Sequence, residues 1–82
     1  MGIIIWEDFS GQTEFIGGYY VPEDDTIHID YTLPLPQQEE ILIHEVIESL
    51  MGQHVQHWVI EGLTTRIYGA LNALKERNNA SR

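Results

Sequence analysis

The chain has 82 residues, 43% of them apolar, which suits one small domain with a single core. Four Lys and Arg residues stand against thirteen Asp and Glu, and the net charge of −9 disfavours contact with nucleic-acid phosphate. The chain contains no cysteine, so disulfides and thiolate metal ligands are excluded. No apolar run approaches the ~20 residues of a membrane-spanning helix, and no signal peptide is evident. We therefore expect a cytoplasmic protein that binds neither nucleic acid nor membrane.

The four basic residues are unevenly placed, because all of them lie at or after Arg66. Residues 1–65 contain no Lys or Arg. A surface of this kind attracts a metal cation or a basic protein partner, although the same charge also favours solubility.

In chain order, the first half of the sequence predicts about three short β-strands. Residues 3–6 form a β-branched run, and residues 12–21 form a second segment that contains a Gly-Gly pair. A turn is expected at 22–25, and residues 26–31 then alternate apolar and polar side chains. The alternation predicts that Ile27, Ile29 and Tyr31 face the core while His28 and Asp30 face solvent.

The second half predicts two amphipathic helices, the first over about 36–51 and the second from about 54–56 to 77. Pro36 suits a helix start, and Gly52 suits the stop between the two helices. Apolar side chains recur at helical spacing in both. They are Leu42, Ile43, Val46, Ile47, Leu50 and Met51 in the first helix, and Ile60, Leu63, Ile67, Leu71 and Leu74 in the second.

These elements predict an α+β fold in which a small antiparallel sheet packs against two antiparallel helices. The helices should meet through Ile43, Val46 and Leu50 on one side and Ile60, Leu63 and Ile67 on the other. We expect a single domain over residues 1–82 with a disordered tail at 78–82.

The sequence His44-Glu45-Val46-Ile47-Glu48 carries the strongest chemical signal. At about 100° per residue, His44 and Glu48 lie only about 40° apart on one helix face, as two ligands of one metal would. The pattern departs by one residue from His-Glu-x-x-His, in which two His ligands hold zinc and the Glu acts as general base. Here Glu48 stands in place of the second His, and Glu45 stands in the position of the base.

A catalytic zinc needs three protein ligands, so a third should come from the second helix. His57 and Glu61 are the candidates because they lie one turn apart on the face that borders the apolar stripe, and His54 is a weaker one. Glu61 could also serve as the partner that orients an imidazole. Glu45 would take a proton from a metal-activated water as that water attacks a carbonyl. Because His ligands bind only when neutral, metal affinity should fall as the pH drops through about 6.

Five segments taken together carry a resemblance to a known family, and they are 18–20, 27–29, 33–34, 41–50 and 57–63. With these segments, most of the chain resembles the small zincin-like proteins of bacteriophage and prophage genomes, which look like miniature versions of the phage-repressor-cleaving metallopeptidases. The resemblance implies that His44, Glu48 and His57 are metal positions, zinc being the expected metal, and that Glu45 is the base.

The candidate metal site and the acidic composition lead to two hypotheses for the function, which belong to different classes. The first is a minimal zinc-dependent metallopeptidase that acts on a protein or peptide of the host or phage. The second is a non-catalytic acidic protein, either a degenerate zincin or a nucleic-acid mimic, that binds a host protein. The chain could also form a homo-oligomer. Metal content discriminates the two functions, because only the first requires a bound metal.

Overall fold

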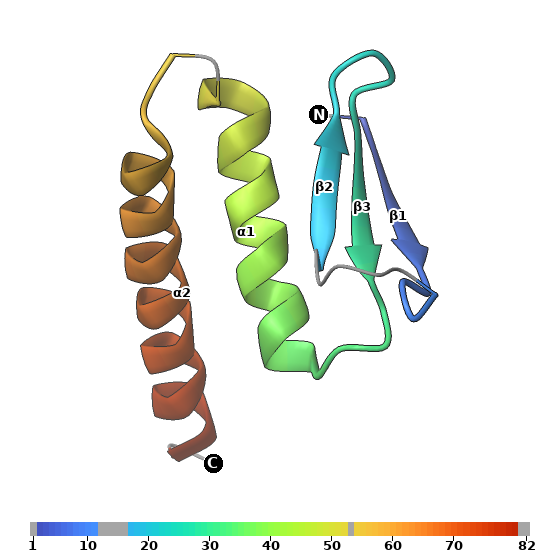
Figure 1. Cartoon of the computed structure of the whole chain (residues 1–82). Helices are drawn as coiled ribbons and strands as arrows, with labels where there is room; N and C mark the ends of the chain where they lie inside the picture. Colours follow the sequence, from blue (N-terminus) through green and yellow to red (C-terminus); the bar gives the residue numbers. More distant parts are fainter. Residues whose placement is uncertain (1, 12–16, 53, 81–82) are drawn as a thin grey trace.

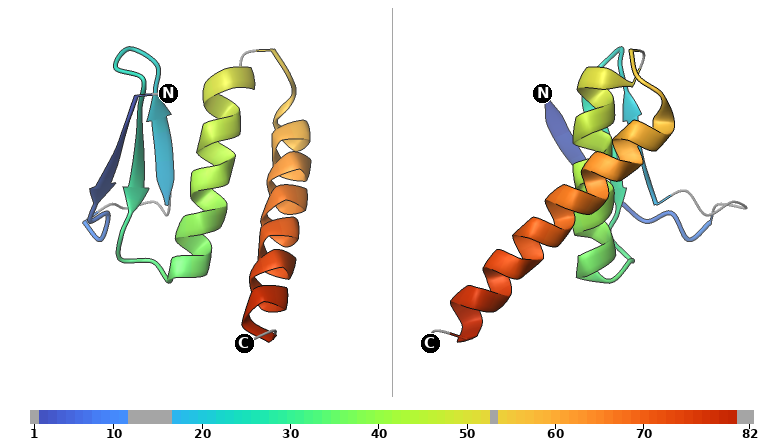
Figure 2. Two further views of the ribbon diagram at one scale, coloured as in Figure 1. Left: turned by 180° about the vertical axis from the view of Figure 1, so that it is seen from behind. Right: turned by 90° about the vertical axis from the view of Figure 1, so that its left-hand side faces the viewer.

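The computed structural model describes residues 2–11, 17–52 and 54–80. Three strands precede two helices in the chain (Figure 1). The elements are β1 (Ile3–Glu7), β2 (Gly18–Val21), β3 (Thr26–Asp30), α1 (Leu35–Met51) and α2 (His57–Ala80). In space they form layers, with the sheet on one side of α1 and α2 on the other (Figures 1 and 2). The predicted α+β fold, with two packed antiparallel helices after the sheet, is confirmed.

The sheet is mixed, and the prediction of a purely antiparallel sheet was wrong. Its strand order is β1-β3-β2, so β3 occupies the centre. The β2–β3 hairpin is antiparallel, whereas β1 pairs with β3 in parallel. Strand periodicity cannot reveal this arrangement, because side chains alternate in the same way in parallel and antiparallel pairs. Part of the predicted second strand, residues 12–16, lies outside the described residues.

Central strand β3 is covered on both faces, which the sequence pattern did not predict. Ile27 and Ile29 are fully buried, as expected. Asp30 is also buried, whereas Tyr31 follows the strand and is exposed. The cause lies in the segment after β1, where Phe9 is buried and its backbone N–H donates to the Asp30 carboxylate at 3.5 Å. Asp30 therefore anchors a loop from within the sheet instead of facing solvent.

Asp30 should make the stability of the fold depend measurably on pH. A hydrogen bond from the Thr32 hydroxyl lowers the pKa of Asp30 below its usual value, helped by the backbone amides of Thr32 and Phe9 and opposed by burial. Because the pKa of Asp30 is lower in the folded protein than in the unfolded chain, the ionised carboxylate stabilises the fold. This stabilisation is complete above the pKa of the unfolded carboxyl, about 3.9, and is lost as the pH falls through the pKa of the folded protein.

Urea unfolding of the wild type and the Asp30→Asn variant between pH 6 and pH 2 tests this expectation. The difference in stability between the two proteins should shrink below about pH 4. Thr32→Val, which removes the main hydrogen-bond donor, should reduce the same pH dependence. A difference that stays constant down to pH 2 would contradict the assignment.

Helix α1 approaches the sheet closely beside β2. A Cβ atom on Gly18 would lie 2.6 Å from Cγ2 of Ile41 and 2.9 Å from the backbone oxygen of His28. Gly17 has a φ of +79°, a conformation that favours glycine. The Gly-Gly pair thus brings Ile41, and with it the face of α1 that carries the motif, against the hairpin.

The two helices pack against each other, and α2 crosses α1 obliquely (Figure 2). Helix α1 begins one residue earlier than predicted and ends at Met51, and the N–H of Gly52 donates to the Glu48 carbonyl at 2.9 Å. Helix α2 continues to Ala80, so the predicted disordered tail is wrong for 78–80, and residues 81–82 lie outside the described part. Within the described residues, neither helix combines the length and the apolarity needed to cross a membrane.

The side chains that were predicted to join the two helices are buried to very different extents. Ile60 is fully buried, whereas Leu50 is 78% exposed and Ile67 is 40% exposed. Leu71 and Leu74, further along α2, are also largely exposed. Helical periodicity identifies a continuous apolar stripe, but two helices that cross obliquely cover only the part of the stripe near the crossing.

This uneven burial predicts different costs for two substitutions on one helix. Ile60→Ala should lower the free energy of unfolding by about 2–5 kcal/mol, because it removes buried methyl groups and leaves a cavity. Leu74→Ala, at a side chain that is 53% exposed, should cost less than about 1 kcal/mol. Chemical denaturation measures both. If Ile60→Ala does not fold, Ile60→Val should still lower the free energy of unfolding by about 0.5–1.5 kcal/mol. Equal losses of stability from the Ala substitutions at Ile60 and Leu74 would contradict this packing.

Candidate metal centre

His44 and Glu48 lie one turn apart on α1 and face the same side of the helix. The Nε2 atom of His44 is 3.0 Å from Oε2 of Glu48, and both side chains are partly exposed. The helix that holds them is continuous from Leu35 to Met51, so its backbone fixes their spacing. Two potential ligands are therefore placed together by local structure alone.

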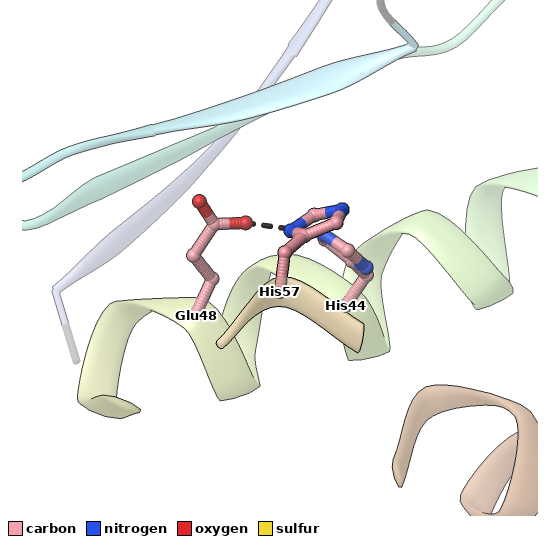
Figure 3. Close-up of side chains that lie close together, drawn as sticks. All are labelled: His44, Glu48 and His57. Atoms are coloured by element: carbon pink, nitrogen blue, oxygen red, sulfur yellow. Dashed lines mark ion pairs between the residues drawn. The ribbon is translucent and has the colours of Figure 1, made fainter. Parts of the chain in front are cut away.

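The turn between the helices brings His57 to this pair. His57 is the first residue of α2, and its ring centre lies 5.1 Å from that of His44, with 63° between the ring planes. One ligand atom each from His44, Glu48 and His57 lies within 4.8 Å of the other two. The three side chains lie close together on one side of α1 (Figure 3).

The donor set fits a divalent transition metal. Zinc binds imidazole nitrogen and carboxylate oxygen at about 2.0–2.2 Å, so tetrahedral ligand atoms lie about 3.3 Å apart. The pair on α1 already has this separation, and a small movement of the His57 side chain, which is 62% exposed, would bring the third atom to it. Three protein ligands leave one tetrahedral position for water or substrate, as in catalytic zinc sites.

The other two candidates for the third ligand lie outside this group. Glu61 pairs with Nε2 of His57 at 3.1 Å. A metal-binding His commonly contacts a carboxylate through one nitrogen and the metal through the other, so Glu61 is placed to orient the ring. His54 is exposed in the interhelical turn and borders a neighbouring pocket.

Glu45 lies beside the three candidate ligands but is turned into the interior. Its side chain is only 7% exposed, and no hydrogen bond to its carboxylate is present within the described residues. Burial raises the pKa of the Glu45 carboxyl to about 7, with a further increase from the charge of Glu48 and an opposing effect from His57. A divalent cation on the neighbouring ligands would favour the charged carboxylate.

Two pockets border the three candidate ligands, and each pocket is lined by one of these residues. The first, of about 210 Å³, lies between the helices and is lined by Glu40, Ile41, His44, Glu45 and Thr64. A molecule in it would contact both Glu45 and the candidate ligand His44. The second, of about 350 Å³, is lined by Tyr20, Pro22, Glu48, Ser49, Leu50, Gly52 and His54. Sequence reasoning missed the second pocket, because it joins the hairpin to the far end of α1.

The other face of the sheet holds a polar cluster that the sequence pattern also missed. His28 was expected to face solvent, but its ring stacks on Tyr19 at 4.5 Å between centres. Its Nδ1 atom contacts the Glu7 carboxylate, and Nε2 lies 3.2 Å from the Thr26 hydroxyl. With these partners, His28 has a structural role that joins all three strands.

Comparisons with protein families, with curated proteins and with solved structures found no match to this chain.

Proposed function

We propose that the chain is a minimal metal-dependent hydrolase that holds zinc, or a similar divalent metal, on His44, Glu48 and His57. The observation that carries the proposal is the convergence of two imidazoles and one carboxylate, from two helices, beside a buried carboxylate. His44 and Glu48 could be neighbours by chance in any helix, but the approach of His57 from α2 is a second, non-local coincidence. A peptide bond is the substrate that the resemblance to zincin-like proteins implies.

The roles of the residues follow from their positions. A bound zinc would supply Lewis-acid polarisation of a carbonyl and a more acidic water. Glu45 shares a pocket with the ligand His44, so it would receive the proton from the attacking water and pass it to the leaving amine. Glu61 would hold the His57 ring in its binding orientation. Glu48 would bring a negative charge to the metal where a second His would be neutral, which would weaken the metal as a Lewis acid and favour slow turnover.

The alternative is a non-catalytic protein that uses its acidic surface to bind a partner. The observation in its favour is the charge distribution, since residues 1–65 carry no Lys or Arg. On this alternative the pairs His44–Glu48 and His57–Glu61 are ordinary contacts between residues one helical turn apart.

Metal analysis tests the proposal against this alternative. The protein should be purified without chelator and without metal-affinity resin, and its zinc content measured by mass spectrometry. About one zinc per chain is expected, and metal-free protein titrated with zinc in a calorimeter should bind the same amount. If neither experiment finds a bound divalent metal, the hydrolase proposal is wrong and the binding-protein alternative is favoured.

A further inference from the structure

The pocket of about 350 Å³ beside Glu48 offers a binding site that the proposed chemistry does not use. Its walls come from β2 and the hairpin turn on one side, with Tyr20 and Pro22, and from the end of α1 on the other, with Ser49 and Leu50. Its volume falls in the range of small-molecule sites. Since Glu48 lines the pocket and is also a candidate ligand, a peptide whose carbonyl lay at the metal could place a neighbouring side chain in this pocket.

The surroundings of the pocket carry negative charge. The hairpin turn that continues from Pro22 contains Glu23, Asp24 and Asp25, and the Asp25 carboxylate accepts a hydrogen bond from the Tyr20 hydroxyl at 2.9 Å. The negative end of the α1 dipole also lies at this pocket, and the last turn of α1 has no basic residue.

Among the described residues that line this pocket or form the hairpin turn, none is a Lys or Arg. Eleven of the thirteen acidic residues lie in 1–56, the other two being Glu61 and Glu76, and 1–56 contains no Lys or Arg. The exposed His54 lies at the rim of the pocket. A zinc on the three ligands would offset the charge of Glu48, but not that of the hairpin turn.

We propose that this pocket selects a basic side chain, Lys or Arg, of a peptide bound at the metal centre. The inference rests on the proposed function, because it treats the pocket as part of the same substrate site. An aliphatic stem in the pocket would lie against Pro22 and Leu50, and its charged end would be attracted by Glu48 and by the acidic turn that continues from Pro22. An acidic side chain would be repelled by the same groups.

Binding of matched peptides tests the inference. The probes are fluorescein-labelled peptides with blocked ends that differ at one central position, where they carry Lys, Leu or Glu. Fluorescence anisotropy is measured with the Glu45→Gln protein, which should not cleave them, both zinc-loaded and metal-free. The Lys peptide should bind about tenfold more tightly than the Glu peptide, and the difference should shrink as salt is added. The preference should be larger without zinc, because Glu48 then keeps its full charge.

Two charge-reversal variants separate the pocket from the overall charge of the protein. Asp24→Lys, in the hairpin turn, should reduce the preference for Lys over Glu several-fold. Glu76→Lys, an equal change of charge near the far end of α2, should leave the preference nearly unchanged. Ser49→Lys, which places a cation within the pocket wall, should remove the preference while the zinc affinity, measured by calorimetry, confirms that the variant is folded.

The outcomes distinguish this inference from the proposed function. If the protein binds zinc but shows no preference for the Lys peptide, the basic pocket is overturned and the metal centre remains. The same holds if the Leu or Glu peptide binds most tightly, or if no peptide binds at millimolar concentration. Equal effects of Asp24→Lys and Glu76→Lys would also overturn it. A preference for Lys in a protein that binds no zinc would retain the pocket but remove the metal centre.

Discussion

Replacing His44 with Ala should weaken zinc binding by about a hundredfold or more, which corresponds to at least about 2.7 kcal/mol. The change removes one of the three proposed donors and leaves a pair, Glu48 and His57, that come from different helices. His57→Ala should have a similar effect, because it removes the donor that closes the site. Competition between the metal-free protein and a chromophoric zinc chelator measures these affinities.

His54→Ala provides the matched control for these ligand variants. His54 lies three residues before His57 but outside the group of converging ligands, so its loss should change zinc affinity little. Circular dichroism would verify that all variants keep their helices. Equal zinc affinity in the wild type and the His44→Ala variant would place the metal elsewhere on the protein.

Glu45→Gln should retain zinc but lower hydrolysis by about 10²–10⁴-fold, the usual contribution of a general base. The amide keeps the size of the carboxylate but cannot accept a proton from water. It also removes the cost of burying a charge at a side chain that is only 7% exposed, so the variant should be at least as stable as the wild type. Cleavage of a denatured protein mixture, analysed by mass spectrometry at equal zinc occupancy, measures the activity.

Glu76→Gln is the control for this experiment, since it makes the same chemical change near the end of α2, away from the metal centre. It should retain wild-type cleavage. If wild type and Glu45→Gln cleave equally at background level while both hold zinc, general proteolysis is excluded and the metal serves a structural or binding role.

The sequence alone was sufficient for features that depend on near neighbours in the chain. Helical periodicity placed α1 to within one residue, and one helical turn fixes the relation of His44 to Glu48 wherever the helix lies. The burial of Ile27 and Ile29 followed in the same way from the alternation of a strand. These predictions succeeded because each requires only the regular geometry of a single element.

Features that depend on how the elements pack were decided by the tertiary structure. The parallel pairing of β1 with β3 and the burial of Asp30 beside Phe9 arise from contacts between distant segments. The exposure of Leu50 shows that no other described segment covers this end of the apolar stripe. The sequence left His57, Glu61 and His54 open as third ligand, and the packing of α2 on α1 brings His57 to the pair.

The pocket between Tyr20 and the end of α1 likewise has no signal in the sequence, because its two walls lie some thirty residues apart. Local periodicity carries information about the orientation of side chains around one axis. It carries no information about which helices and strands pack against one another. In this protein the packing depends on the close approach of α1 to Gly18 and on the oblique crossing of the two helices.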